Sequence, residues 1–167
     1  MNKKVLSEQV LYYGNISMPN GFEIEEKNLT NDILQSELYP NTVPFSKTLD
    51  RLSTYISDHI NVKYNINLIQ KNTYGNIYRP GEITLPMAGA DPVDLKNSPD
   101  FILLYGVKVR DCNIRIYYDD NRRKGRSWDI QLTTNSFVMF PSTNMYIISN
   151  SQKSLLNFTQ TINYEYI

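Results

Sequence analysis

Residues 156–166 read LNFTQTINYEY, and this stretch decides the fold class. Its residues alternate between one face that is mostly apolar and aromatic and a second face that is mostly polar. A two-residue repeat of this kind predicts a β-strand with one face against a core. The predicted core face carries Leu156, Phe158, Gln160, Ile162, Tyr164 and Tyr166.

Strand patterns continue upstream of this stretch, separated by turn residues. Residues 100–107 form a near-continuous apolar run, which is typical of a strand buried on both faces. Shorter strand-like segments cover residues 5–13, 66–74, 114–118, 128–132, 137–140 and 145–148. From residue 66 onward there are about seven short strands at spacings of roughly 8–12 residues, which indicate a sandwich or jelly roll.

One segment has a helical period instead. Its apolar residues recur at steps of four, three, four and four, which places them on one stripe of a helix, and Ser46 can cap the start. The stripe consists of Phe45, Leu49, Leu52, Ile56 and Ile60. Residues 22–38 fit a short helix or a turn. We therefore predict a mainly β (α+β) fold, a jelly roll or double-stranded β-helix with one supporting helix around 45–60, in a single domain spanning residues 1–167.

Length and charge exclude several classes of protein. The chain has 167 residues, enough to bury a core, and its 17 basic and 17 acidic side chains give zero formal net charge. This balance argues against a nucleic-acid binder held by a generally basic surface. No apolar run reaches about 18 residues, and Glu8 precedes any apolar stretch at the start. We expect no membrane span and no signal peptide.

The counts of histidine and cysteine restrict the chemistry further. The chain has one histidine, His59, and one cysteine, Cys112, so it cannot build a two-histidine iron or zinc site. We expect His59 to be structural. We expect Cys112 to be an inert thiol, because the neighbouring Asp111 carboxylate raises a thiol pKa. We predict no metal, no cofactor and no catalytic residue.

Several motifs resemble those of the AlkB-like 2-oxoglutarate/iron oxygenases. An Asn-x-Tyr strand followed by a Tyr-x-x-Gly turn precedes the active site in that family, and this chain has Asn72-Thr73-Tyr74 and then Tyr78-Arg79-Pro80-Gly81. Residues 130–132 and 137–142 resemble the family's later strand pair, and residues 157–163 resemble its final arginine-containing strand. The resemblance covers roughly residues 45–167 and implies a double-stranded β-helix.

The family's functional residues are not carried over. Where the family has His-x-Asp, residues 86–91 read PMAGAD, which keeps only the carboxylate of Asp91. Met145-Tyr146 stands where the second histidine belongs. The arginines that hold 2-oxoglutarate correspond to Asn157 and Asn163, which cannot make a charge-assisted pair. The resemblance thus implies the barrel without the oxygenase, in a degenerate protein of phage or viral type.

The most concentrated positive charge lies at the predicted hairpin tip 119–126. Its cations are Arg122, Arg123, Lys124 and Arg126, and Tyr118 and Trp128 flank them as possible stacking partners. Such a tip suits phosphate groups or a subunit contact. The alternative is a solvated turn whose charge is balanced by Asp119, Asp120 and Asp129.

Three function classes remain after these exclusions. We predict a non-catalytic structural or assembly protein, a virion component whose partners are copies of itself or other virion proteins, in the virion or host cytoplasm. The first alternative is a polyanion- or glycan-binding module that acts through the tip 122–126. The second alternative is an oxygenase-like enzyme.

Overall fold

A computed structural model describes residues 9–16, 26–39, 47–119 and 125–167. These residues form two α-helices, α1 (Glu26–Leu38) and α2 (Lys47–Tyr64), and a 3-10 helix, Leu95–Asn97. They also form eight strands: β1 (Tyr12–Asn15), β2 (Leu68–Tyr78), β3 (Phe101–Lys108), β4 (Cys112–Tyr118), β5 (Arg126–Leu132), β6 (Ser136–Pro141), β7 (Tyr146–Asn150) and β8 (Asn157–Tyr166).

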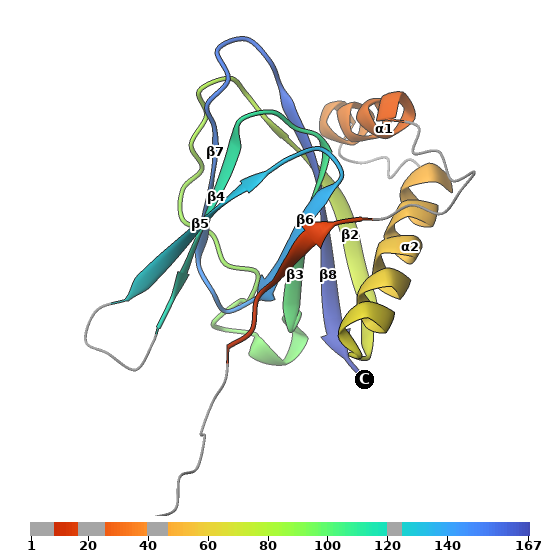
Figure 1. Cartoon of the computed structure of the whole chain (residues 1–167), viewed down its shortest axis with the longest axis vertical. Helices are drawn as coiled ribbons and strands as arrows, with labels where there is room; N and C mark the ends of the chain where they lie inside the picture. The colour runs from red at the N-terminus through yellow and green to blue at the C-terminus, as the bar shows by residue number, and fades with distance from the viewer. Residues whose placement is uncertain (1–8, 17–25, 40–46, 120–124) are drawn as a thin grey trace, which may run out of the picture.

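The strands form two antiparallel sheets that face each other (Figure 1). The large sheet has the order β1-β6-β3-β8-β2, and the small sheet has the order β5-β4-β7. The segment after β2 runs beside β7, which it meets at two bridges, Ile83 to Ser149 and Met87 to Tyr146. The predicted fold class, a jelly roll or double-stranded β-helix, is confirmed.

Both faces of the large sheet are buried, and each meets a different layer. Its outer face packs against the helices, with Leu103, Phe137 and Ile162 among the buried residues. Its inner face meets the small sheet, and Leu104, Val138 and Ile114 lie in that second core. The interior of the barrel is therefore packed with side chains.

Strand β8 has the alternation of apolar and polar residues that the sequence predicts, but its polar face is also buried. Phe158, Ile162 and Tyr164 point to the helix side, as predicted for the core face. The polar face, which carries Thr159 and Thr161, is equally buried because it points into the barrel. The polar residues of β8 are thus interior residues of the protein.

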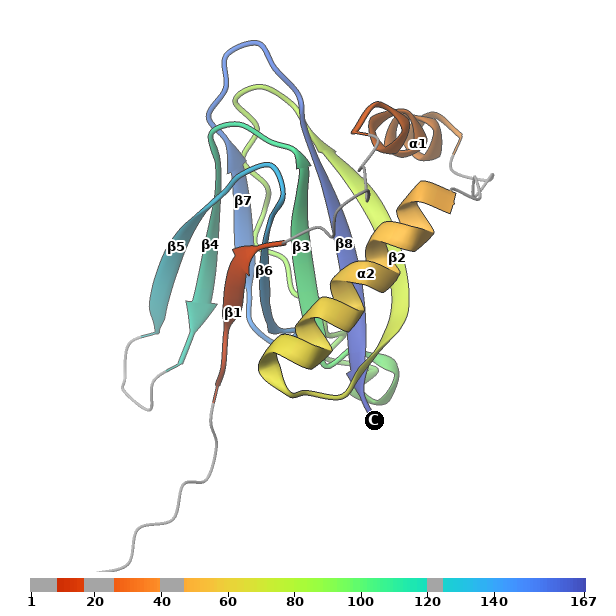
Figure 2. The ribbon, with the colours of Figure 1, turned by 45° about the vertical axis from the view of Figure 1, so that its right-hand side comes forward.

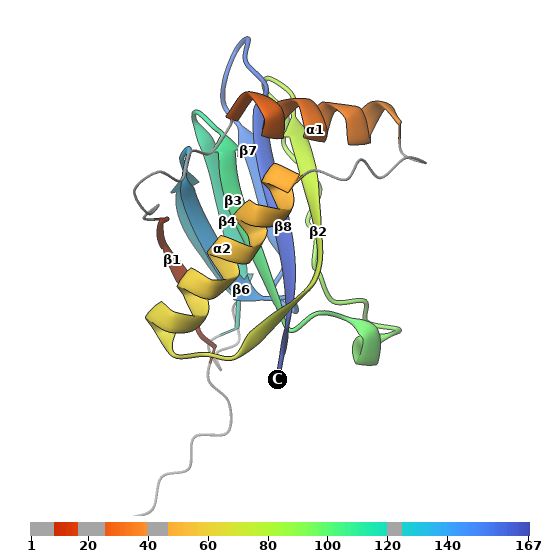
Figure 3. The ribbon, with the colours of Figure 1, turned by 90° about the vertical axis from the view of Figure 1, so that its right-hand side faces the viewer.

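Two helices cover the outer face of the large sheet, as Figures 2 and 3 show. Leu52, Ile56 and Ile60 of α2 are buried there, which confirms their part of the predicted stripe. Phe45, and the side chain of Leu49, lie outside the described residues.

The prediction of one supporting helix is incomplete, because α1 forms a second one. Its buried residues, Leu29 and Ile33, give it a short apolar stripe. Ile33 lies where a Cβ on Gly75 of β2 would be, so the glycine lets α1 approach the sheet closely. The approach of α1 therefore depends on a residue more than forty positions away.

The predicted first strand, residues 5–13, is displaced. Strand β1 covers Tyr12–Asn15 because this segment pairs with β6, from Tyr12 opposite Met139 to Asn15 opposite Ser136. Residues 5–8 of the predicted strand lie outside the described residues. Neither α1 nor α2 is long and apolar enough to cross a membrane.

Candidate functional site

One half of the barrel interior is polar. The inward residues of β6 and β3 are apolar, whereas those of β8 and β2 carry amides and hydroxyls. These polar residues are Asn157, Thr159, Thr161 and Asn163 of β8 and Asn72, Tyr74, Asn76 and Tyr78 of β2. Asn76 Nδ2 donates to Thr161 Oγ1 at 2.8 Å, and Asn163 Nδ2 donates to Asn72 Oδ1 at 2.7 Å. The polar half is an uncharged hydrogen-bonding wall.

Tyrosine hydroxyls extend this wall toward the small sheet. Tyr78 is 7% exposed and hydrogen-bonds the Thr159 side chain, and Tyr146 of β7 is 6% exposed. Burial raises the pKa of Tyr78 above its ordinary value and raises the pKa of Tyr146 to about 12. Both phenols therefore stay protonated at neutral pH.

The buried tyrosines predict a fall in stability at alkaline pH. Burial raises the pKa of Tyr105 and Tyr164 as well, so in the folded protein these phenols and those of Tyr78 and Tyr146 hold their protons more tightly than in the unfolded chain. Tyrosines in the unfolded chain have a pKa of about 10. The free energy of unfolding should therefore be unchanged below that pH and decrease above it.

Tyrosinate absorbance measured against pH checks this expectation, with urea unfolding measured at the same pH values. A group of tyrosines should titrate only when the protein unfolds. Titration of all 13 tyrosines near pH 10 in the folded protein would contradict it.

A polar pocket opens beside this wall, at the end of the barrel where β8 finishes. Its volume is about 310 Å³, and it is lined by Lys71, Asn72, Gly89, Asp91, Asp94, Asn97, Ser98, Pro99 and Asn163. Asn163 is 9% exposed, and its Oδ1 accepts no hydrogen bond from the described residues. A buried acceptor without a donor costs free energy, so a ligand that supplies a donor is favoured here.

Lys71 is the cation of this pocket, and acidic groups surround it. Its Nζ donates to Glu165 Oε1 and to the Asn97 carbonyl oxygen, both at 2.5 Å, so contacts within the described residues leave one of its three N–H donors for a ligand. Asp91 and Asp94 add two carboxylates to the lining. The pocket therefore disfavours an anion and suits a ligand rich in hydroxyl or amine donors.

The residues at the family's iron positions do not fit an iron ion. Gly89 stands two residues before Asp91, at the position of the histidine in His-x-Asp. Ile102 occupies the space where the Cβ of a side chain on residue 89 would lie. Met87 and Tyr146 are joined through their backbones, with N–H to O distances of 2.9 and 2.8 Å. The phenol of Tyr146 packs against the ring of Phe140, 5.1 Å between centroids.

The other candidate ligands are also unsuited. Asp91 is exposed, and its Oδ1 accepts from the Val93 N–H at 2.9 Å. His59 lies on α2, outside the barrel. No group of three histidine, cysteine or acidic residues within the described segments could hold a metal ion. The donor set is thus wrong for iron, and we derive no step through iron.

Asn157 and Asn163, which correspond to the arginines that hold 2-oxoglutarate in the family, have different surroundings. Asn157 is 1% exposed and is fully engaged with Arg110: its Oδ1 accepts from the backbone N–H at 2.9 Å, and its Nδ2 donates to the carbonyl at 3.0 Å. Asn157 therefore fastens β8 to the turn before β4. Asn163 lines the polar pocket and is the one available to a ligand.

The residues predicted at the hairpin tip are only partly described. Arg122, Arg123 and Lys124 lie outside the described residues. Arg126 begins β5 opposite Tyr118, and Trp128 lies opposite Ile116. Tyr118 and Trp128 line a second, largely apolar pocket together. Binding of a polyanion, a glycan or a subunit by the tip stays a prediction.

One acidic neighbour of the tip is engaged elsewhere. Asp129 pairs with Arg115 across β4 and β5, with Oδ1 2.7 Å from Nε. The alternative of a solvated tip whose charge is balanced by Asp119, Asp120 and Asp129 stays a prediction, because Arg122, Arg123 and Lys124 lie outside the described residues.

Cys112 is inert for a different reason from the one predicted. It is fully buried in the core of the barrel, and burial raises the pKa of its thiol to about 12. The predicted cause was the neighbouring Asp111 carboxylate. The thiol therefore stays protonated at neutral pH.

Solved structures with the same fold include prolyl hydroxylases and a 2-oxoglutarate-dependent epimerase. A prolyl-4-hydroxylase of Pseudomonas putida has 9% identity and a TM-score of 0.62, with 94% of this chain and 92% of that chain covered. The 2-oxoglutarate-dependent epimerase SnoN of nogalamycin biosynthesis has 9% identity and a TM-score of 0.66, with 93% and 77% covered. A prolyl hydroxylase of Trichoplax adhaerens has 12% identity and a TM-score of 0.57, with 93% and 83% covered. No protein-family model and no curated protein sequence matches.

These comparisons correct the functional prediction. A non-catalytic structural or assembly protein was predicted, and the chain was predicted not to be an enzyme. Both predictions are wrong, because the structures that share its fold are oxygenases and epimerases; the enzyme alternative fits them better. At such low identity the likeness shows the fold, so the chemistry has to follow from this chain's own residues.

Sequence reasoning missed Lys71 and Asn97, which line the polar pocket. A signal for the polar wall was present: the residues of β8 that point away from the helices read Asn, Thr, Thr and Asn at a two-residue repeat. In a strand buried on both faces, such a repeat indicates a polar interior. No sequence pattern predicts that Lys71 contacts Asn97, because the two residues are far apart in the sequence and meet only in the folded chain.

Proposed function

We propose that this chain is an enzyme that moves protons on a small, hydroxyl-bearing carbonyl compound in the polar pocket. The observation that carries the proposal is that Asn163, whose buried Oδ1 accepts no hydrogen bond from the described residues, lines a pocket together with Asp91 and Lys71. The oxygenases and epimerases with this fold support an enzyme.

Each of the three residues has a distinct part in the proposal. Asp91 is the base, because its exposed carboxylate lines the pocket and has one oxygen beyond the Val93 contact. Lys71 supplies its remaining N–H to the substrate carbonyl oxygen. Asn163 Oδ1 accepts from a substrate hydroxyl and so fixes the orientation of the substrate.

The proposed step needs no oxidant. Asp91 takes a proton from the carbon beside the carbonyl, and the bonding electron pair moves through that carbon to the carbonyl oxygen. Lys71 stabilises the resulting enolate oxygen by a charge-assisted hydrogen bond. Return of the proton to the opposite face of the same carbon completes an epimerisation. Return of the proton to the former carbonyl carbon, while the proton of the adjacent hydroxyl moves to the enolate oxygen, completes an isomerisation. Atoms and charge balance without iron.

Exchange of carbon-bound hydrogen for deuterium tests the proposal. Small hydroxy-carbonyl compounds, such as dihydroxyacetone, are incubated with the protein in D₂O and followed by NMR. The native chain should exchange the proton beside the carbonyl. Asp91→Asn should slow this exchange by about 100-fold or more, since it removes the general base.

The control is Asp50→Asn, which removes an exposed carboxylate of α2 on the other side of the large sheet. It should leave exchange unchanged. Equal exchange by Asp91→Asn and the native chain would overturn the proposal. Succinate formation on addition of Fe(II) and 2-oxoglutarate would also overturn it.

The predicted viral source and the location in a virion or host cytoplasm stay predictions. They do not enter the proposed chemistry.

A further inference from the structure

A second pocket lies between the segment at residues 9–13 and the strands β4, β5 and β6. Its volume is about 340 Å³, within the range of small-molecule sites. The lining residues are largely apolar, among them Leu11, Ile116, Trp128 and Phe140, with Asn144 at one end. This pocket shares no lining residue with the polar pocket.

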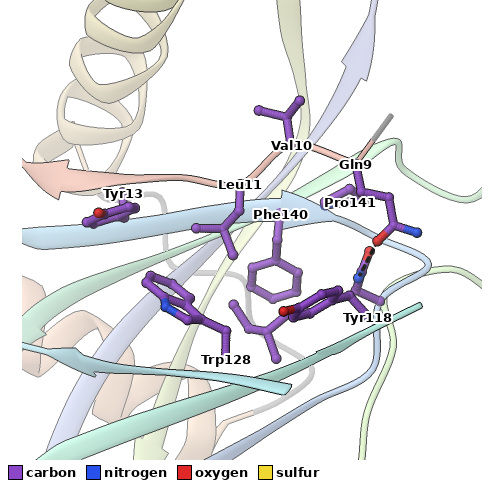
Figure 4. A pocket seen from close by; sticks show the side chains of 10 residues that line it. Gln9, Val10, Leu11, Tyr13, Tyr118, Trp128, Phe140 and Pro141 are labelled. Carbon is purple, nitrogen blue, oxygen red and sulfur yellow. Dashed lines mark hydrogen bonds between the residues drawn. The ribbon is translucent and has the colours of Figure 1, made fainter. Parts of the chain in front are cut away.

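Aromatic rings make the walls of this pocket (Figure 4). Leu11, Trp128 and Phe140 turn their side chains toward one another in the close-up view. Tyr13 packs against Trp128 with 5.2 Å between ring centroids, which supports the indole from one side. Such walls favour a flat, apolar ring as the ligand.

One buried polar atom sets a second requirement. Asn144 is 8% exposed, and its Nδ2 donates to the Tyr117 carbonyl at 2.9 Å and to Gln9 Oε1 at 3.3 Å. Because a carbonyl can only accept, this bond fixes the NH₂ toward Tyr117. The Oδ1 of Asn144 is buried and accepts no hydrogen bond from the described residues.

We infer that this pocket is a binding site for a planar aromatic molecule that carries one hydrogen-bond donor. The ring packs against Trp128, Phe140 and Leu11, and the donor, a phenol O–H or a ring N–H, satisfies Asn144 Oδ1. The lining residues described here carry no charged side chain, so the ligand that fits best is neutral. The inference does not depend on the proton-transfer reaction at the polar pocket.

Fluorescence of Trp128, the chain's single tryptophan, reports binding directly. The probe is p-nitrophenol, kept neutral by a mildly acidic buffer, since its absorbance quenches tryptophan emission. The matched ligand is 4-nitroanisole, which has the same ring without the O–H donor. The native chain should show saturable quenching with both, and p-nitrophenol should bind about three- to tenfold more tightly, as one hydrogen bond allows.

Two variants separate the contributions of ring and donor. Asn144→Leu keeps the size of the side chain and removes the acceptor, so it should bind both ligands with equal affinity. Leu11→Asp places a charge in the apolar wall and should weaken both at least tenfold. Val62→Asp, an equally drastic change at an 84% exposed position of α2, should change neither affinity.

Three results would overturn the inference. They are the absence of saturable quenching, equal affinity of the native chain for the two ligands, and unchanged binding by Leu11→Asp. Circular dichroism and thermal melting of each variant establish that it is folded before its affinity is compared.

Discussion

Leu52→Asp is expected to lower the free energy of unfolding by about 4 kcal/mol. Leu52 is 1% exposed and belongs to the core between α2 and the outer face of the large sheet. An aspartate there loses the apolar contact and buries a carboxylate among aliphatic and aromatic side chains. For a chain of this size the melting temperature should fall by roughly 8–16 °C.

Val62→Asp is the matched control, because Val62 lies on the same helix and is 84% exposed. The same chemical change there should alter the free energy of unfolding by less than about 0.5 kcal/mol. Urea unfolding of both variants and the native chain measures the difference. Similar stabilities for Leu52→Asp and Val62→Asp would contradict the packing of α2 on the sheet.

The sequence predicted best the elements whose apolar residues recur with a regular period. The α2 stripe has a helical period because a single face must meet the sheet, and β8 has a two-residue period because each face meets a different layer. The limits of β1 could not be predicted, since they are set by pairing with β6 rather than by local composition. The packing of α1 on the sheet could not be predicted either, because its close approach depends on Gly75 of a distant strand.

The site was predictable only where the resemblance supplied positions. It identified residues 86–91, Met145-Tyr146, Asn157 and Asn163 as the places to examine. The sequence could not show that Ile102 occupies the space beside Gly89, since that contact joins a loop to β3. Nor could the sequence distinguish the roles of the two asparagines: Asn157 hydrogen-bonds the turn before β4, and Asn163 lines a pocket.

The functional prediction failed because it equated missing iron ligands with missing catalysis. The lone histidine of the sequence leaves too few imidazoles for an iron triad built by this chain alone. It does not exclude chemistry by Asp91 and Lys71 in a pocket whose polar groups are incompletely paired. One fold can support several different reactions, so the missing iron ligands do not decide whether this chain is an enzyme.

Gly106→Ala tests a close contact between the backbone of β3 and the turn before β6. A Cβ on Gly106 of β3 would overlap the carbonyl oxygen of Thr133, in the turn between β5 and β6. That oxygen is held by Ser136, whose backbone N–H and Oγ donate to it at 3.1 and 2.8 Å. The turn is also tied to β3 by the Asn135 N–H, 2.8 Å from the Gly106 oxygen.

Since neither side of this contact can move without losing hydrogen bonds, Gly106→Ala should cost about 3 kcal/mol of unfolding free energy. Gly125→Ala is the control, because its nearest neighbour, Asp119 Oδ1, would lie at an ordinary 3.5 Å. That control should change stability by less than about 1 kcal/mol. Urea unfolding measures both. Equal stability of the two variants would mean that the β5–β6 turn yields to the added methyl group, and that the hydrogen bonds of Ser136 and Asn135 do not fix its distance from β3.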